Sequence, residues 1–135
     1  MNPASNTRQI SFCLEPIKLL EKAQNKVLEL TYLATNLLFL NREIEIFQTI
    51  DSRLSDLEED FETVSKKFQT LSMSERREEG NCLIWKMCQI KTLIQEKLRT
   101  ISNASERLSL ENFSLHLTRI EIDYLNPVVI STIGD

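Results

Sequence analysis

Glycine and proline are scarce in this 135-residue chain, which has two glycines and three prolines. Neither residue occurs between Pro16 and Gly80, or between Gly80 and Pro127. Because these residues are the strongest interruptions of regular structure, their absence over such long spans predicts continuous helices. The single glycine between the two spans predicts one corner. We therefore expect an all-α fold, arranged as an elongated antiparallel helical hairpin or coiled coil.

Residues that carry chemistry are also few. His116 is the only histidine and has no second ligand at a metal-binding spacing. The cysteines, Cys13, Cys82 and Cys88, form no CxxC pair, and we expect them to be buried or half-buried packing residues. No glycine-rich phosphate loop is present. The sequence thus predicts a non-enzymatic protein with no catalytic residue, no metal and no cofactor.

The chain lacks a basic excess and a long apolar run. Its net charge is −4, which does not favour direct nucleic-acid binding. The most apolar window, residues 27–40, is shorter than the roughly 20 residues that a membrane span needs, so we expect no membrane insertion. The polar first nine residues lack a secretory signal, and an odd cysteine count is typical of a reducing compartment. We expect the cytoplasm, with the nucleus as the alternative.

The expected organisation is a disordered tail (1–9), one hairpin domain (10–126) and a C-terminal tail (127–135). Pro16 suits the first position of the first helical arm. Apolar residues then repeat at alternating steps of four and three, which is a heptad seam. The members of this seam are Ile50, Leu54, Leu57, Phe61, Val64, Phe68 and Leu71.

We place the turn of the hairpin near residues 72–82. Ser72 and Glu75 have the spacing of a capping box, and Gly80-Asn81 is the expected corner. The second arm has a weaker seam, with a plausible break between Ser102 and Ser105. The residues of this second seam are Leu83, Met87, Ile90, Ile94, Ile101, Leu108 and Leu115.

Two segments allow more than one interpretation. Residues 113–124 fit either a helix or alternating strands, and the helix is favoured because no turn separates two strands. Residues 16–30 fit either the start of the first arm or a separate third helix.

Opposite charges favour pairing of the two arms. Residues 42–62 carry eight acidic residues against two basic ones, whereas residues 82–107 carry five basic residues against two acidic ones. Folding back near Gly80 sets the acidic arm beside the basic one. In the register that the seams suggest, Phe61 lies opposite Ile94.

Several apolar residues lie off both seams and would be exposed on a two-helix hairpin. Exposed apolar surface of this kind usually marks a protein interface, so we expect partner helices to complete a bundle here. The alternative is that residues 16–30 cover this surface. The predicted interface residues are Leu28, Tyr32, Leu38, Phe39, Ile46, Leu110, Ile122 and Leu125.

The segment from Glu106 to Asn112, ERLSLEN, resembles a stretch in a small coiled-coil subunit of augmin, a spindle complex that recruits γ-tubulin to existing microtubules. The resemblance implies a structural subunit of a hetero-oligomeric helical complex at the spindle or kinetochore, with microtubule contact only through that complex. One alternative is a subunit of a Mediator-like or vesicle-tethering complex. Another is a self-contained helical-bundle adaptor or chaperone.

Overall fold

The protein is all-helical, as its sequence predicts. A computed structural model describes the backbone of residues 3–40 and 45–133 and the side chains of residues 16–36 and 45–133, and this part of the chain contains no strand. The long helices are α1 (Pro3–Leu40), α2 (Glu45–Lys67), α3 (Met73–Leu98) and α4 (Ala104–Ile120). A short 3₁₀ turn, η1 (Phe68–Thr70), follows α2. A π turn, η2 (Glu121–Leu125), and α5 (Asn126–Ile130) follow α4.

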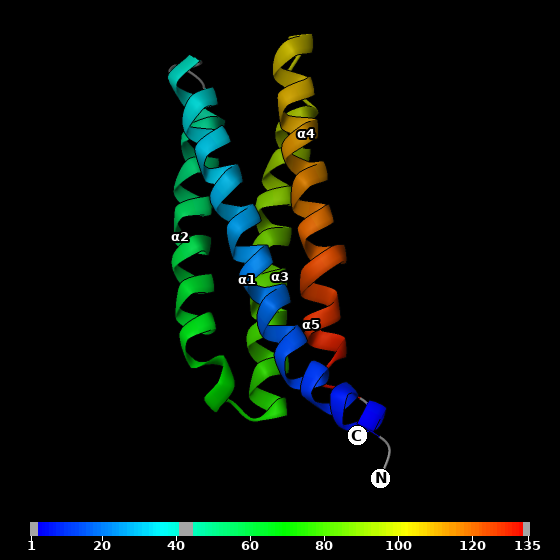
Figure 1. Ribbon diagram of the computed structural model, residues 1–135. Helices are drawn as coiled ribbons and strands as arrows, with labels where there is room; N and C mark the ends of the chain where they lie inside the picture. Colours follow the sequence, from blue (N-terminus) through cyan, green and yellow to red (C-terminus); the bar gives the residue numbers. More distant parts are fainter. Residues whose placement is uncertain (1–2, 41–44, 134–135) are drawn as a thin grey trace.

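The four long helices form an antiparallel bundle within the chain (Figure 1). Helices α2 and α4 each lie between α1 and α3, and the described ends of the chain lie at the same end of the bundle. Hydrogen bonds join Thr35 to Asp51 at 3.0 Å and Gln24 to Ser65 at 3.2 Å, so α1 and α2 run in opposite directions. Each arm of the expected hairpin is therefore two helices, and the chain supplies four helices by itself.

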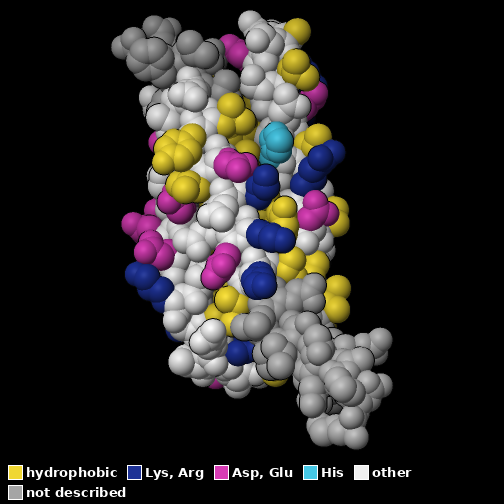
Figure 2. Space-filling model, viewed as in Figure 1, with side chains coloured by type: hydrophobic (Ala, Val, Ile, Leu, Met, Phe, Trp, Pro, Cys, Tyr) yellow, Lys and Arg dark blue, Asp and Glu magenta, His cyan; other side chains and the backbone are white. Residues whose placement is uncertain are grey.

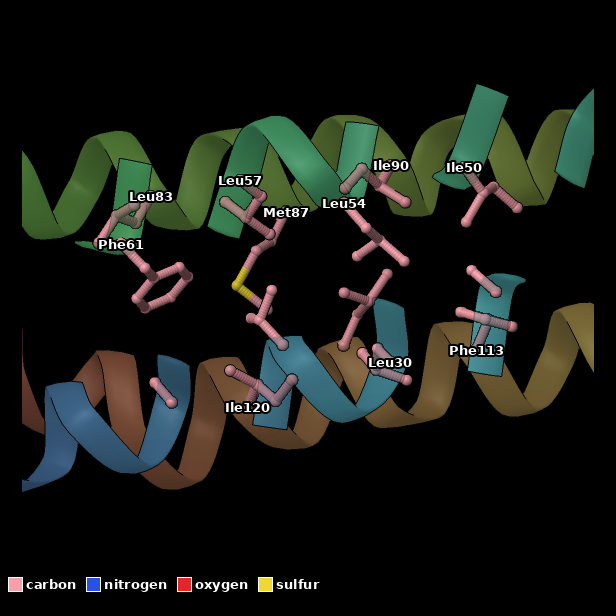
Figure 3. Packing of buried hydrophobic residues seen from close by; sticks show 14 of the residues in the cluster. Leu30, Ile50, Leu54, Leu57, Phe61, Leu83, Met87, Ile90, Phe113 and Ile120 are labelled. Atoms are coloured by element: carbon pink, nitrogen blue, oxygen red, sulfur yellow. The ribbon is translucent and has the colours of Figure 1, made fainter. Parts of the chain in front are cut away.

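One apolar core runs along the inside of the bundle and draws on all four helices. Leu30 from α1, Leu57 from α2, Met87 from α3 and Phe113 from α4 are all buried (Figure 3). The seam expected in α2 is confirmed from Ile50 to Phe68, where every member is buried. Because these residues already face the chain's own helices, this core needs no partner to bury it.

The predicted corner at Gly80-Asn81 is wrong. The chain turns at residues 68–72, and Gly80 lies buried inside α3. A Cβ at position 80 would stand 2.7 Å from Val129 Cγ2, so this glycine permits a close approach between α3 and α5. The capping box of Ser72 and Glu75 is confirmed, and it begins the whole of α3.

The register of α2 against α3 also differs from the expected one. Lys86 pairs with Asp60, and Lys67 pairs with Glu79 at 3.1 Å. Asp60 adjoins Phe61, which the seams set opposite Ile94, so the register is displaced by about two helical turns. Two heptad seams fit together in many registers, and the position of the turn selects among them. The expected attraction between acidic and basic arms is present in the Lys86–Asp60 pair, and this hydrogen bond raises the pKa of Lys86.

Both expected tails contain helix. Residues 3–9 belong to α1, which runs through Pro16, so residues 16–30 form no separate helix. Near the other end, Val128 and Thr132 are buried, and Arg77 of α3 donates hydrogen bonds to the hydroxyl and carbonyl oxygens of Thr132 at 3.1 and 2.8 Å. The expected break at 102–105 is confirmed between α3 and α4, where Asn103 caps α4, and residues 113–124 are helical.

Candidate functional site

The outer face of α4, η2 and α5, together with the residues just after α5, carries exposed aliphatic side chains, which we name the outer stripe. Each of the five is between 50% and 64% exposed. Three of them stand seven residues apart, which returns a helix to nearly the same face. The side chains of the outer stripe are Leu108, Leu115, Ile122, Ile130 and Ile133. Figure 2 shows hydrophobic side chains along the edge of the bundle that α4 and α5 form.

The opposite face of the same helix is buried in the core. Leu110, Phe113, Leu117 and Ile120 point inward from α4 at the usual helical spacing. Helix α4 is therefore apolar on two opposite faces, and only one of them is covered within the chain. A contiguous apolar surface that is left exposed typically marks an interaction site.

The π turn keeps both faces of this segment in line. The next core residue after Ile120 is Leu125, five positions on, whereas an α-helix repeats after three or four. In η2 the N–H of Asn126 bonds to the carbonyl of Glu121, which takes up one extra residue. Pro127 has no N–H to offer the α-helical ladder at this point. As a result, Ile130 follows Ile122 on the outer stripe after eight residues.

Polar contacts fix α4 and η2 against α3. Lys91 pairs with Glu121 at 3.0 Å, and the two side chains are only 20% exposed. Arg107 donates to the backbone carbonyls of Leu98 and Ile101, the latter at 3.1 Å, and lies 3.7 Å from Glu111. These contacts set the rotation of α4, and hence the direction in which the outer stripe faces.

A shallow groove of about 380 Å³ lies on the other flank of α4, between α4 and α1. Its charged side chains are of both signs: Lys26 and Glu29 come from α1, and Arg119 and Asp123 from the α4 side. His116 also lines this groove. The mixture of charges gives the groove no preference for an anion or a cation.

Two exposed aromatic side chains lie outside the outer stripe. Tyr32 on α1 is 65% exposed, and Trp85 on α3 is 60% exposed. Trp85 borders an open hollow with Arg53, Thr92 and Leu93. Each is a single aromatic residue on its helix face, so neither makes a surface as long as the outer stripe.

The predicted interface residues fall into three groups. Ile46, Leu110 and Leu125 are buried in the chain's own core, because α2, α4 and η2 turn these positions inward. Tyr32 and Ile122 are exposed, and Leu28 is half-buried. The side chains of Leu38 and Phe39 lie outside the described residues. Ile122 is thus the one predicted residue on the outer stripe.

Leu108 and Leu115 were not predicted to be surface residues. Both were expected in the inner seam of the second arm, because seven-residue spacing fits a coiled-coil core as well as an outer line. The competing signal was present in Leu110, Phe113, Leu117 and Ile120, a denser apolar set on the other face.

Cys82 and Cys88 differ in their surroundings, and the side chain of Cys13 lies outside the described residues. Cys82 is exposed, which differs from the expected packing role. Cys88 is half-buried beside Glu121, with its sulfur 3.5 Å from a carboxylate oxygen, and burial raises the pKa of its thiol. Within residues 16–36 and 45–133 no group of three histidine, cysteine or acidic side chains could hold a metal ion.

No protein-family model, curated protein or solved structure matches this chain. In the described part of the chain, no helix combines the length and the apolar character needed to cross a bilayer.

Proposed function

We propose that this protein is a non-enzymatic helical-bundle subunit that joins a larger protein assembly by docking a partner helix on the outer stripe. The observation that carries the proposal is the second apolar face of α4, which the chain leaves uncovered. A helix-in-groove or helix-on-helix contact uses apolar anchors at this spacing.

The energetics support a contact of this kind. Full burial of one aliphatic side chain contributes about 1.5–3 kcal/mol, so five half-exposed ones contribute on the order of 5 kcal/mol from this side alone. The partner's own apolar residues add to this. Because the core closes within the chain, the partner is expected to attach to a finished bundle and not to complete an unfinished one.

The assembly that the resemblance suggests is a spindle or kinetochore complex similar to augmin, in which microtubule contact is indirect. The segment Glu106–Asn112, on which the resemblance rests, includes Leu108 at the start of the outer stripe. In this proposal the protein works in the cytoplasm at the spindle. A Mediator-like or tethering complex in the nucleus or cytoplasm remains the alternative, and the docking surface is the same in both.

The test is whether charge on the outer stripe removes the protein from its assembly without unfolding it. We expect Leu115→Lys with Ile122→Lys to leave the helical content and thermal melting of the purified chain unchanged. In native extract the tagged wild type is expected to elute in a high-mass complex, and the double variant near the mass of the free bundle.

The matched control is Trp85→Lys with Met73→Lys, which also replaces two exposed apolar residues but on α3. This control should stay in the complex. If the outer-stripe variant co-elutes with the complex as fully as the control does, the outer stripe is not the docking surface.

A further inference from the structure

We propose that residues 126–133, which we name the latch, open and close as a unit about the π turn, and that the outer stripe is complete only while the latch is closed. The latch comprises α5 and the residues just after it. This inference rests on the proposed function, because it concerns the regulation of the same docking surface. Opening of the latch withdraws part of that surface from a partner.

The closed position of the latch is defined by particular contacts outside α4. The latch lies at the end of the bundle where α3 begins, and α5 packs against both α1 and α3 (Figure 1). Arg77 of α3 donates to the hydroxyl and carbonyl oxygens of Thr132 at 3.1 and 2.8 Å. Val129 stands so close to Gly80 that a Cβ there would come within 2.7 Å of its Cγ2. These contacts hold the latch to the bundle.

The join between α4 and the latch is weaker than a continuous α-helix. In η2 the N–H of Asn126 bonds to the carbonyl of Glu121, and the next residue, Pro127, has no N–H to donate. Prolines and π turns are the usual places where a helix bends. On the α4 side of this point, Lys91 pairs with Glu121 at 3.0 Å and Leu125 is buried. Bending is therefore directed to the residues after Leu125.

The latch has little of its own to keep it folded. Helix α5 has only five residues, whereas an isolated helix is marginal even at about 12–15 residues. Within residues 126–133, which the structure describes in full, the buried side chains are Val128 and Thr132. Segments that bury few side chains open at a lower free energy than the core does. The latch therefore depends on its contacts with α1 and α3, and it opens while the four long helices stay folded.

The latch carries the last part of the docking surface. Ile130 and Ile133 belong to it and are 64% and 59% exposed. Leu108, Leu115 and Ile122 precede the bend and stay on the bundle when the latch opens. A partner that contacts all of these residues stabilises the closed latch. By linkage, any contact that favours the closed latch also strengthens docking.

Arg77 separates the latch from the docking surface itself. It lies on α3 and is not part of the outer stripe, so its effect on docking has to pass through the latch. The neighbouring Arg76 is the matched control, because its guanidinium donates to the carbonyl oxygens of Phe68 and Gln69 at 3.0 and 3.3 Å. Replacing either arginine by alanine removes two hydrogen bonds, but only Arg77→Ala removes them from the latch.

The first experiment measures amide hydrogen exchange in the purified full chain by NMR. The amides of Ser131, Thr132 and Ile133 each bond to a carbonyl of the latch at 3.0 Å, so they report its opening. We expect these three amides to share one protection factor, at least about 100-fold below that of residues 83–94 in α3. Arg77→Ala should lower the shared value by at least about 10-fold, and Arg76→Ala should leave it unchanged.

Fraying from the end of a helix predicts a different pattern. Protection would then decline step by step from Ser131 to Ile133, with no common value. Such a graded decline overturns the proposal, and so does an equal effect of the two arginine variants. Protection in the latch as high as in residues 83–94 also overturns it, because the latch would then open only with the whole bundle.

The second experiment locks the latch with a disulfide. In a chain with Cys13, Cys82 and Cys88 replaced by serine, Gly80→Cys is combined with Val129→Cys, which removes the methyl group that a Cβ at position 80 would meet. The two positions are close enough for the short Cβ separation that a disulfide needs. Oxidation should raise the protection of the latch amides by at least about 10-fold, and reduction should restore it. Protection that is the same in the oxidised and reduced chains overturns the proposal.

The same variants connect the latch to docking. In native extract we expect part of the Arg77→Ala chain to leave the high-mass complex, while Arg76→Ala and the oxidised, locked chain stay in it. If Arg77→Ala stays in the complex as fully as Arg76→Ala, the latch does not regulate docking.

The outcomes also separate this inference from the proposed function. Hydrogen exchange is measured on the free chain, so a latch that does not open refutes this inference and leaves the docking surface intact. If the double variant Leu115→Lys with Ile122→Lys stays in the complex, the docking surface is refuted, and with it the regulation of docking by the latch.

Discussion

Helices α2 and α4 occupy equivalent positions in the bundle, since each lies between α1 and α3, yet their outer faces differ. Helix α2 is apolar only toward the core, and acidic side chains such as Asp56 and Glu59 cover its outside. Helix α4 is apolar toward the core and carries Leu108 and Leu115 on the outside. Packing within the chain makes the same demand on both helices, so it does not account for the exposed aliphatic side chains of α4.

The inner and outer apolar patterns have similar spacing but differ in what they contribute to folding. Removing a residue of the inner pattern should unfold the bundle, whereas removing one of the outer pattern should leave it folded.

The largest effect is expected from Phe61→Asp in α2. Phe61 is fully buried, and an unpaired carboxylate at this position should lower the free energy of unfolding by about 4 kcal/mol or more. Urea unfolding followed by circular dichroism measures the change. Leu115→Asp in α4 is the matched control and should shift the stability of the free bundle by less than about 1 kcal/mol. Equal losses in the two variants would contradict the distinction between the faces.

The next largest effect concerns the contact that holds α5 in place. Gly80→Ala gains about 1 kcal/mol of helix propensity, but its Cβ would stand 2.7 Å from Val129 Cγ2, and such overpacking costs about 1–3 kcal/mol. We expect a net loss of about 1 kcal/mol.

Combining Gly80→Ala with Val129→Ala should recover stability beyond the sum of the single changes. A double-mutant cycle measures this coupling, and a value near zero would show that the two residues do not press on each other.

A small effect is expected from deletion of Asp123 in the π turn. After the deletion, Leu125 follows Ile120 in the core by four positions, and Ile130 follows Ile122 on the outer stripe by seven. Both faces stay in line, so the free energy of unfolding should change by less than about 1 kcal/mol. Loss of folding on deletion would show that the widened turn is itself required.

The smallest effect is a local dependence on pH at the start of α3. Hydrogen bonding from the Ser72 backbone N–H holds the pKa of Glu75 below its ordinary value. Because the pKa is lowered, the ionised Glu75 side chain stabilises the helix at any pH above the ordinary glutamate pKa. This stabilisation is lost as the pH falls through the lowered pKa of the folded chain. Hydrogen exchange of the first amides of α3 should therefore quicken in acid, while Glu75→Gln should reduce this dependence.

Much of the fold could be predicted from the sequence. The lack of glycine and proline correctly indicated helices. The capping box of Ser72 and Glu75 and the expected break at residues 102–105 lie where α3 and α4 begin. The reversal of direction between Leu40 and Glu45 could not be predicted, because neither glycine nor proline stands there. Gly80 misled the prediction because a glycine serves a close helix contact as readily as a turn.

The candidate site was predicted less well, for a reason that lies in α4. Its two faces repeat at intervals that both fit a heptad, and only the position of the neighbouring helices shows which face is inside. Ile122 is exposed, as the prediction requires, whereas Leu110 and Leu125 are buried and Leu108 and Leu115 are exposed, which is the reverse of the prediction. The π turn made the two faces harder to assign, because it shifts the apolar spacing by one residue. No residue before Pro127 marks this shift in the sequence.

The anchoring of the last described residues has a consequence for the order of folding. Gly80 receives Val129, and Arg77 binds Thr132, so the start of α3 gains its final neighbours from residues that are synthesised about 50 positions later. Helices α1 and α2 are consecutive and can pair early, but α3 has one side without a neighbour until α4 and α5 arrive. On the ribosome, the side of α3 that carries Arg77, Gly80 and Lys91 should therefore lack its neighbours until residues 121–132 have emerged.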